Sequence, residues 1–455
     1  MVIERFEVSG LAQYAYIVSD GGEAVAIDPI RDIDRYLDYL RTRKLRLKRI
    51  LETHIHADFA AGSVELAEAT GAELAFSGYD EGERYVYAMP HRAMRDGDVV
   101  TIGGVRLEAR HTPGHTPEHL SFLLYEKNVV QPLAMFTGDF LFVGSMGRPD
   151  LLGEEAKVGL AHELYRSAKY RLADLPDGLL IYPGHGAGSF CGAGMGERAT
   201  TTLGYERATN LYFSYGEEEF VREILASAPP MPAYYPRMKM LNAQGAPPLH
   251  GIPGDRALTA EEVAATQEDV VLIDLRSVEA FAAAHIVGSI NIGAGLNFSL
   301  WAGWLLASSK RIVLIADAGN AEESRRALVR VGLDNIVGVL PMETWIEEGR
   351  DFETMKLRSV IEVERERSSL FLLDVRNADE RTRGIMPGAH SVAVGDLPQH
   401  LQQVPRDAKI VTVCASGYRA SIAASLLARE GYDDVSIMDG GTTAWTRRSL
   451  PLVTE

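Results

Sequence analysis

The sequence predicts an α/β protein of three domains, in which an N-terminal domain precedes two related domains. The chain has 455 residues, whereas a single hydrophobic core usually stops growing near roughly 250 residues. In the first half, short apolar strands alternate with helical stretches, and several strands lead into a histidine or an aspartate. In the second half, one strand-and-helix pattern occurs twice at an interval of about one hundred residues, which is the size of a small domain.

The composition is that of an ordinary globular protein. Hydrophobic residues make up 46% and charged residues 24%, and the net charge of −17 argues against a nucleic-acid partner. The first residues lack the basic start and apolar run of a signal peptide, and no apolar run approaches the ~20 residues that span a bilayer. Two cysteines, Cys191 and Cys414, are too few for a disulfide framework. We therefore expect a cytoplasmic protein without a membrane partner.

Proline and glycine mark the first domain boundary. They are frequent in residues 228–255, which is typical of a linker. The predicted organisation is an N-terminal domain (1–230), a linker (231–256) and two repeated domains (257–354 and 358–455).

The repeat is visible in two strands and one tryptophan. Each copy alternates strands with helices, which predicts a parallel sheet covered on both faces. The matching segments are residues 271–276 with 372–376, residues 311–315 with 409–413, and Trp345 with Trp445.

Six potential metal ligands follow or border predicted strands of the N-terminal domain. Strand ends carry loops that present side chains to a cleft. Three of the six stand next to a glycine, and the set is His54, His56, Asp58, His115, Asp139 and His185.

This ordered set resembles the metallo-β-lactamase superfamily over residues 1–230. The resemblance implies an αββα sandwich that holds metal between two sheets. The usual pattern of the superfamily has a histidine directly after the aspartate, where this chain has Phe59. A second metal would keep only Asp58, His185 and a shared Asp139, so we expect one metal ion.

Within the superfamily, the chain is most similar to the persulfide dioxygenases, because Asp139 is followed by the stretch 147–150 with Arg148. The resemblance implies one Fe(II) per chain, since two histidines and a carboxylate with open positions suit a non-haem iron oxygenase. The implied iron ligands are His54, His115 and Asp139, and the implied residues that orient ligands and waters are His56, Asp58 and His185.

Zinc is the alternative metal. His54, His56 and His115 could form a three-histidine zinc site that activates water. Such a site would suit a thioester hydrolase of the glyoxalase II type.

Two further residues are candidates for substrate binding. Arg148 either attracts the anionic end of a thiol carrier or anchors its loop through a salt bridge. Cys191, in the glycine-rich stretch 186–196, either carries a persulfide or contacts substrate, or is a buried, inert thiol.

The second repeated domain has a cysteine loop between a strand and a helix. Cys414 follows the strand at 411–413, and the loop leads through Arg419 into a helix at 421–430. Backbone amides and the helix N-terminus stabilise a thiolate or a persulfide there, and Arg419 suits sulfite or thiosulfate. The loop resembles that of rhodanese domains, and its Cys-x4-Arg spacing is shorter than the Cys-x5-Arg loop of phosphatases.

The first repeated domain lacks the nucleophile. Alignment of the strands places Ala316 at the position of Cys414 and Ala321 at the position of Arg419. We interpret residues 257–354 as an inactive rhodanese-like domain, the silent copy, and residues 358–455 as the active copy.

The whole chain resembles fused persulfide dioxygenase–sulfurtransferases. The resemblance implies that O2 oxidises a low-molecular-weight persulfide to sulfite, which takes sulfur from persulfidated Cys414 to give thiosulfate. Such chemistry detoxifies sulfide and persulfide, and we expect a homo-oligomer. The alternatives are a zinc thioester hydrolase fused to a sulfurtransferase, and rhodanese copies that serve as sulfur-carrier or binding modules for a partner protein.

Overall fold

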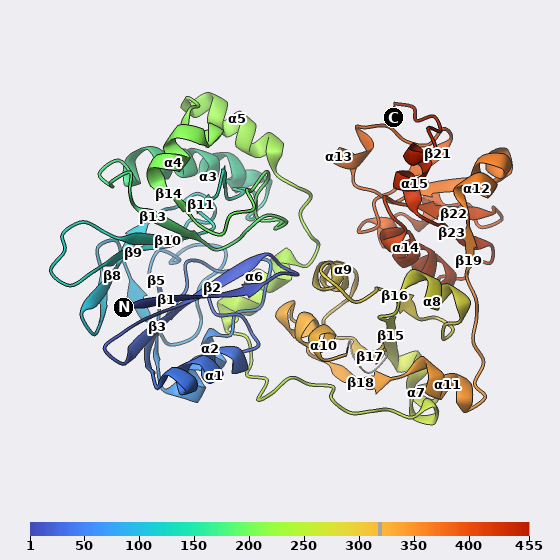
Figure 1. Cartoon of the computed structure of the whole chain (residues 1–455), viewed down its shortest axis with the longest axis horizontal. Helices are drawn as coiled ribbons and strands as arrows, with labels where there is room; N and C mark the ends of the chain where they lie inside the picture. Colours follow the sequence, from blue (N-terminus) through green and yellow to red (C-terminus); the bar gives the residue numbers. More distant parts are fainter. Residues whose placement is uncertain (317–320, 455) are drawn as a thin grey trace. The chain divides into compact units, whose positions relative to one another are not determined.

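The computed structural model describes residues 1–316 and 321–454. Contacts divide the chain into two compact units (Figure 1). The first unit contains residues Met1–Gly251 and Val329–Gly332, and the second contains the remainder.

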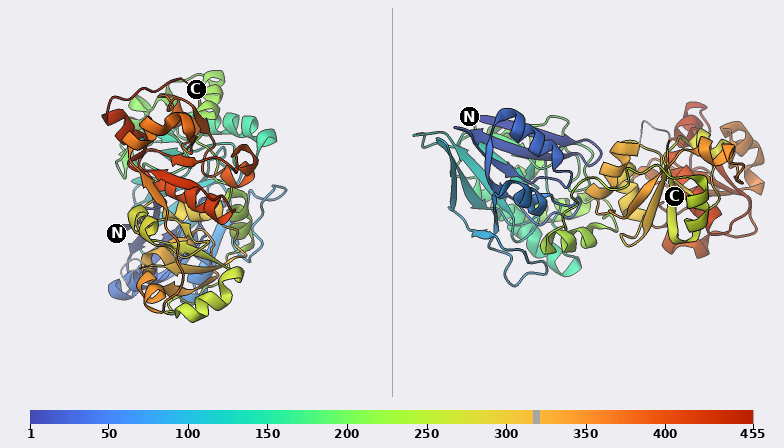
Figure 2. Two further views of the ribbon diagram at one scale, coloured as in Figure 1. Left: turned by 90° about the vertical axis from the view of Figure 1, so that its right-hand side faces the viewer. Right: turned by 90° about the horizontal axis from the view of Figure 1, so that it is seen from below.

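Two six-stranded sheets form the centre of the first unit (Figure 2). One sheet has the order β1-β2-β3-β4-β5-β6 and the other β14-β13-β10-β9-β8-β7. The strands of the first sheet are β1 (Val2–Val8), β2 (Gln13–Asp20), β3 (Glu23–Ile27), β4 (Arg46–Leu51), β5 (Glu73–Ser77) and β6 (Arg92–Met94). Those of the second are β7 (Val99–Ile102), β8 (Val105–His111), β9 (Leu120–Tyr125), β10 (Ala134–Gly138), β13 (Leu180–Pro183) and β14 (Thr201–Thr202).

Strand β9 joins two cores because both of its faces are buried. Phe122 and Leu124 lie in the core between the two sheets, while Leu123 and Tyr125 lie in a second core with α3 and α5. Successive side chains of a strand point to opposite faces, which explains this division. The helices of this unit include α1 (Asp34–Arg43), α2 (Ser63–Thr70), α3 (Glu154–Arg166), α4 (Leu203–Thr209) and α5 (Glu217–Ser227). The αββα sandwich is thus confirmed.

The segment expected to be a linker differs from that expectation. Residues 231–256 contain helix α6 (Tyr235–Gln244), in which Met238, Lys239 and Asn242 are buried. A proline in the first helical turn favours this start, because the missing amide hydrogen has no helical partner there.

Two parallel sheets form the second unit, as predicted for the repeated domains. The silent copy has the order β16-β15-β17-β18 and the active copy β19-β23-β22-β20-β21. The strands of the silent copy are β15 (Val270–Asp274), β16 (Ile290–Asn291), β17 (Arg311–Ile315) and β18 (Ile336–Leu340). Those of the active copy are β19 (Lys356–Arg358), β20 (Phe371–Asp374), β21 (Ala389–Ser391), β22 (Ile410–Val413) and β23 (Val435–Met438).

Helices accompany both sheets of the second unit. The silent copy contains α7 (Ala260–Thr266), α8 (Val278–Ala283), α9 (Phe298–Leu305), α10 (Ala321–Arg330) and α11 (Met342–Glu347). The active copy contains α12 (Val360–Glu366), α13 (Ala378–Arg381), α14 (Tyr418–Arg429) and α15 (Gly441–Arg447).

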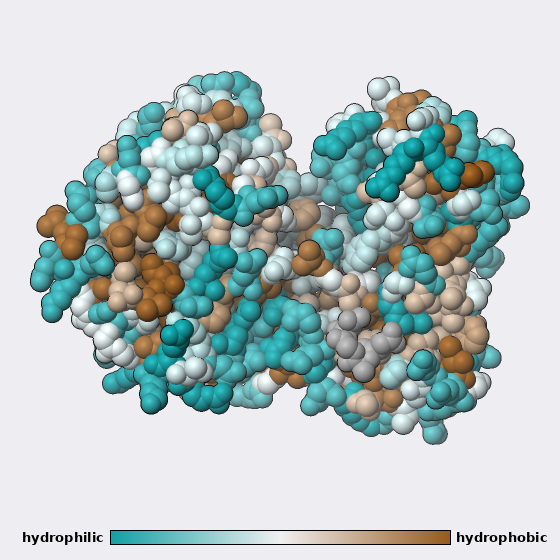
Figure 3. Space-filling model, in the orientation of Figure 1, coloured by the Kyte–Doolittle hydropathy of each residue, from teal (hydrophilic) through white to brown (hydrophobic). Residues whose placement is uncertain are grey.

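Hydrophobic residues on the face shown in Figure 3 form small groups scattered among hydrophilic ones. Isolated surface hydrophobics of this kind are normal for globular proteins. Across residues 1–316 and 321–454, no helix is both long and apolar enough to cross a membrane.

Candidate functional site

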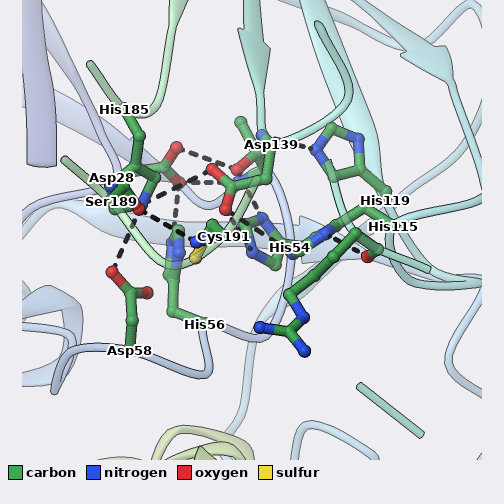
Figure 4. A network of polar contacts seen from close by, with 12 residues as sticks. Asp28, His54, His56, Asp58, His115, His119, Asp139, His185, Ser189 and Cys191 are labelled. Carbon is green, nitrogen blue, oxygen red and sulfur yellow. Dashed lines mark hydrogen bonds and ion pairs between the residues drawn. The ribbon is translucent and has the colours of Figure 1, made fainter. Parts of the chain in front are cut away.

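Three side chains from three strand ends converge in the first unit (Figure 4). His54 follows β4, His115 lies between β8 and β9, and Asp139 follows β10. The Nε2 atoms of His115 and His54 lie 3.5 Å and 4.0 Å from Oδ2 of Asp139. One donor atom from each residue lies within 4.8 Å of the others, and all three side chains are buried.

These donor atoms fit a divalent metal ion. Within the described residues, Nε2 of His54 and Nε2 of His115 make no hydrogen bond. Burial lowers the pKa of His54 and of His115 well below the ordinary value, so both imidazoles are neutral with free lone pairs. Burial also raises the pKa of Asp139 to about 6. Buried polar atoms without partners are costly, and a bound cation removes that cost.

The far nitrogens of the two histidines are held by neighbouring groups. Nδ1 of His54 lies 2.9 Å from Oγ1 of Thr53, which donates to Asp28 at 2.8 Å. Nδ1 of His115 lies 2.8 Å from the backbone oxygen of Arg148. Such contacts fix the ring orientation and aim Nε2 at the metal position.

Behind Asp139 stands a histidine that the sequence interpretation did not select. The backbone amide of Asp139 donates to Nε2 of His119 at 3.2 Å, and Nδ1 of His119 lies 2.9 Å from Oγ1 of Thr112. His119 precedes β9 directly, so its place at a strand end was the available signal.

A second donor group lies on the other side of Asp139. It consists of Asp58, His185 and Cys191, with donor atoms within 4.8 Å of one another. Nε2 of His185 is 3.3 Å from Oδ2 of Asp58 and 3.6 Å from Oδ1 of Asp139. Burial, together with the two aspartates, raises the pKa of the Cys191 thiol well above its usual range. The structure therefore places the buried side chain of Cys191 at the site.

Phe59 and His56 lie next to this group. The ring of Phe59 is buried and lies 4.2 Å from that of His56, measured between centroids. Burial alone would lower the pKa of His56, but Asp28, 3.1 Å from its Nε2, raises it to about 9. Nε2 of His56 is thus engaged by Asp28, and His56 lies outside the group of converging donor atoms, so the geometry favours His54, His115 and Asp139 over the three-histidine zinc set.

Arg148 is engaged by its own loop. Its guanidinium donates to Asp150 at 2.7 Å and 2.9 Å and to the backbone oxygen of Phe190 at 3.0 Å. The side chain is 2% exposed. This geometry supports the loop-anchoring interpretation, and Arg148 contacts the site through the backbone oxygen that His115 uses.

Side chains of helix α6 donate hydrogen bonds to the backbone of residues 52–62, which we call the metal loop. Lys239 donates to the backbone oxygen of Ile55 at 2.6 Å. Nδ2 of Asn242 donates to the backbone oxygens of His56 and Phe59 at 2.9 Å and 2.7 Å. The expected linker thus supplies residues that fix the loop.

The cysteine loop of the active copy is compact. Cys414 follows β22 and is buried, and the amide of Gly417 donates to its Sγ at 3.1 Å. Gly417 has φ of 115°, a conformation that glycine adopts without strain. Both terminal nitrogens of Arg419 donate to Glu380, in one case at 2.6 Å. Arg419 is therefore held at the loop by a carboxylate.

A cavity of about 610 Å³ lies beside this loop. Three arginines contribute to its wall, and Thr442 in that wall donates its amide to the backbone oxygen of Cys414 at 2.8 Å. The cavity residues relevant here are Arg376, Glu380, Arg383, Ala415, Thr442 and Arg447. In the silent copy, Ala316 follows β17 and Ala321 begins α10, and the loop expected at 317–320 lies outside the described residues.

The αββα sandwich with a buried histidine–aspartate centre defines a metal-binding domain, followed by two parallel-sheet domains of which the second carries a cysteine loop. Residues 8–185 match the Metallo-beta-lactamase superfamily, and residues 259–342 and 359–448 match the Rhodanese-like domain. The chain belongs to the metallo-beta-lactamase superfamily and joins that domain to tandem rhodanese domains. The predicted fusion is thereby confirmed.

Two kinds of enzyme are found among the relatives. The chain is 32% identical over 213 residues to the human mitochondrial persulfide dioxygenase ETHE1. The matched region covers 46% of this chain and 74% of the relative. It is 28% identical over 233 residues to the hydroxyacylglutathione hydrolase GloC of Haemophilus influenzae, with 47% of this chain and 99% of the relative covered.

A solved metallo-beta-lactamase from Staphylococcus aureus is similar over a longer part of the chain. It has 35% sequence identity and a TM-score of 0.68, and it covers 75% of this chain and 99% of its own. The similarity therefore extends beyond the first unit.

Proposed function

We propose that this protein is a non-haem iron persulfide dioxygenase coupled to a sulfurtransferase. The first unit would oxidise a low-molecular-weight thiol persulfide with O2, and Cys414 would transfer sulfane sulfur to the sulfite that forms. The product would be thiosulfate, and the activity would protect a cell from sulfide and persulfide.

One observation carries the proposal. His54, His115 and Asp139 form a buried set of two imidazoles and one carboxylate with converging donor atoms. This ligand set leaves positions open on a bound iron and is the set that non-haem iron oxygenases use. The similarity to human persulfide dioxygenase supports the same assignment.

The proposed reactions balance in atoms and charge. In the first, RSS⁻, O2 and water give RSH, sulfite and a proton, so that the outer sulfur is oxidised and O2 is reduced. The Cys414 thiolate would then attack the outer sulfur of a second thiol persulfide, so that its S–S bond breaks, RS⁻ leaves and Cys414 becomes persulfidated. In the last reaction, sulfite attacks the outer sulfur of persulfidated Cys414, the S–S bond breaks, and the Cys414 thiolate leaves. The Gly417 amide, 3.1 Å from Sγ, would stabilise the negative charge on that sulfur.

The chain's other residues would orient and protect the centre. Asp28 holds Thr53 and thereby His54, while His119 fixes the backbone of Asp139. Cys191, buried beside Asp58 and His185, would contact the sulfur end of the substrate.

Metal analysis with oxygen uptake tests the proposal. Protein purified without oxygen should contain about one iron per chain and should consume O2 when glutathione persulfide is added. Asp139→Asn should lose both properties, while Asp174→Asn, which changes an exposed carboxylate paired with Arg110, should retain the metal. Iron-loaded protein that consumes no O2 with any low-molecular-weight persulfide contradicts the proposal.

A zinc-dependent thioester hydrolase remains the second candidate, because GloC is similar over 99% of its own length. It predicts zinc in the purified protein and hydrolysis of S-lactoylglutathione without O2 uptake. The same two measurements therefore separate the candidates.

A further inference from the structure

Helix α14 connects the cysteine loop of the active copy to the silent copy. The helix begins at Tyr418, directly after Gly417, whose amide donates to Sγ of Cys414. A shift of the first turn of α14 would therefore shift the donor that contacts the sulfur.

Three hydroxyl side chains on one face of α14 contact the silent copy. Tyr418 donates to the backbone oxygen of Gly293 at 2.8 Å. Ser421 donates to Oδ1 of Asn291, and Ser425 accepts from the backbone amide of Asn291 at 3.0 Å. Spacings of three and four residues place side chains on one helix face. The first two turns of α14 are thus attached to the residues that end and follow β16.

Asn291 is a buried and fully engaged connector. It is 2% exposed, and Ser421 and Ser425 are 0% and 1% exposed. Its Nδ2 donates to the backbone oxygens of Asp274 and Arg276 at 3.1 Å and 3.0 Å. A buried polar network in which each member has a partner is rigid, and losing one member leaves the others unpaired.

The repeat supplies an internal comparison for Asn291. Asn291 pairs in register with Asp274 of β15, and Ser391 pairs in the same way with Asp374 of β20. Oγ of Ser391 makes no hydrogen bond within the described residues. The asparagine is thus connected to a helix of the other copy, whereas its counterpart in the active copy makes no such contact through its side chain.

We propose that the silent copy acts as the support of the sulfur-transfer loop, with Asn291 and the carbonyl of Gly293 as positioning groups. Their contacts fix the start of α14 and thereby hold the Gly417 amide against Sγ of Cys414. The inference rests on the proposed sulfur transfer by Cys414. It gives the silent copy a role in catalysis without chemistry of its own.

The expected effect is kinetic. Small misplacements of groups around a reacting atom cost rate far more than binding. Removing the Asn291–Ser421 contact should lower kcat for sulfur transfer from thiosulfate to cyanide by roughly ten-fold and leave KM for thiosulfate nearly unchanged.

The experiment uses the whole chain and five variants. Asn291→Ala, Ser421→Ala and their double variant form a cycle in which two groups that act through one contact give less than additive losses. Ser391→Ala is the matched control from the active copy and should retain wild-type kcat. Melting temperatures identify variants that lose stability alone, and Tyr418→Phe removes a single hydroxyl if Asn291→Ala fails to fold.

The outcomes separate the inference from the proposed function. Wild-type protein without sulfur transfer overturns the proposed role of Cys414. Active wild-type protein with unchanged kcat in Asn291→Ala, Ser421→Ala and Tyr418→Phe overturns the positioning role. A rise in KM with constant kcat also overturns it, since it would assign these residues to substrate binding.

Discussion

The two rhodanese-like copies share their parallel sheet and an arginine–aspartate pair, and they differ in the residues of the cysteine loop. In the silent copy, Arg276 donates to Asp274 at 3.0 Å and to the backbone oxygen of Ala284 at 2.7 Å. In the active copy, Arg376 donates to Asp374 at 2.9 Å and to the corresponding backbone oxygen at 3.0 Å. This arginine–aspartate pair lies at the end of an interior strand in both copies, β15 and β20.

The differences lie in a small set of positions around the cysteine loop. Three residues of the cysteine loop and its ion pair have alanine at the corresponding position of the silent copy: Cys414 corresponds to Ala316, Arg419 to Ala321 and Glu380 to Ala280. The groups that hold the fold are thus separate from the groups that would perform sulfur transfer. A rhodanese-like copy without the cysteine and the arginine can therefore keep its fold. Here the silent copy also keeps its contacts with helix α14 of the active copy.

The largest expected effect comes from the nucleophile itself. Cys414→Ser should lower sulfur transfer by at least about 10³-fold, and with persulfide the protein should release sulfite in place of thiosulfate. Adding Ala316→Cys to Cys414→Ser should restore no activity, because the silent copy has no arginine at Ala321. Product analysis by chromatography checks both, and thiosulfate formation by Cys414→Ser contradicts the coupling of the two sites.

The two tryptophans at corresponding positions of the copies test whether both copies are equally well packed. Trp345 and Trp445 are 4% and 0% exposed, and each donates its indole N–H to a backbone oxygen six residues later. Changing either to alanine should lower the free energy of unfolding of the second unit by about 3–5 kcal/mol. Urea denaturation followed by circular dichroism measures this. A negligible effect of Trp345→Ala would show a loosely packed silent copy.

Acid should affect the active copy through a pair that the silent copy lacks. Burial alone would raise the pKa of Glu380, but hydrogen bonds from Arg419 lower it below the ordinary value of 4.5. The pair therefore stabilises the folded state above pH 4.5 and loses this contribution as the pH falls through the folded-state pKa. We expect about 1 kcal/mol, since the glutamate is partly exposed.

Glu380→Gln is the control for the acid effect. The difference in free energy of unfolding between wild type and variant should shrink as the pH falls below 4.5. A difference that stays constant from neutral pH to pH 3 would show that the ion pair contributes no pH-dependent stability.

The smallest expected effect concerns the helix caps. Thr259 and Ser359 each form a capping box with a glutamate three residues later, at the starts of α7 and α12. Alanine at either position should cost about 0.5 kcal/mol, and the two costs should agree. Thermal unfolding of the two variants checks this, and unequal shifts would show that the copies use their first helices differently.

Much of the architecture follows from patterns that the sequence displays directly. The sandwich is predicted from apolar strands that lead into histidines and aspartates. The two parallel sheets are predicted from the repeat at 271–276 and 372–376. The grouping of His54, His115 and Asp139 also follows, because their motifs sit at strand ends of the two sheets that the sandwich packs together.

The missed features depend on contacts between distant parts of the chain. Asp28 and His119 orient ligands from positions whose partners are set only by strand pairing. The interpretation of residues 231–256 as a linker relied on proline and glycine content, whereas tertiary contacts of Lys239 and Asn242 stabilise a helix there. Local composition does not encode such contacts.

The grip of α6 on the metal loop has a consequence for biosynthesis. The loop at residues 52–62 leaves the ribosome long before Tyr234, which donates to the backbone oxygen of Asp58 at 3.0 Å, has been made. Because domains fold as units during synthesis, the nascent loop lacks its support until α6 emerges. A fragment cut at residue 230 would lack it permanently. Metal should therefore bind only after α6 has been synthesised, and the fragment should bind metal as poorly as a nascent chain without α6.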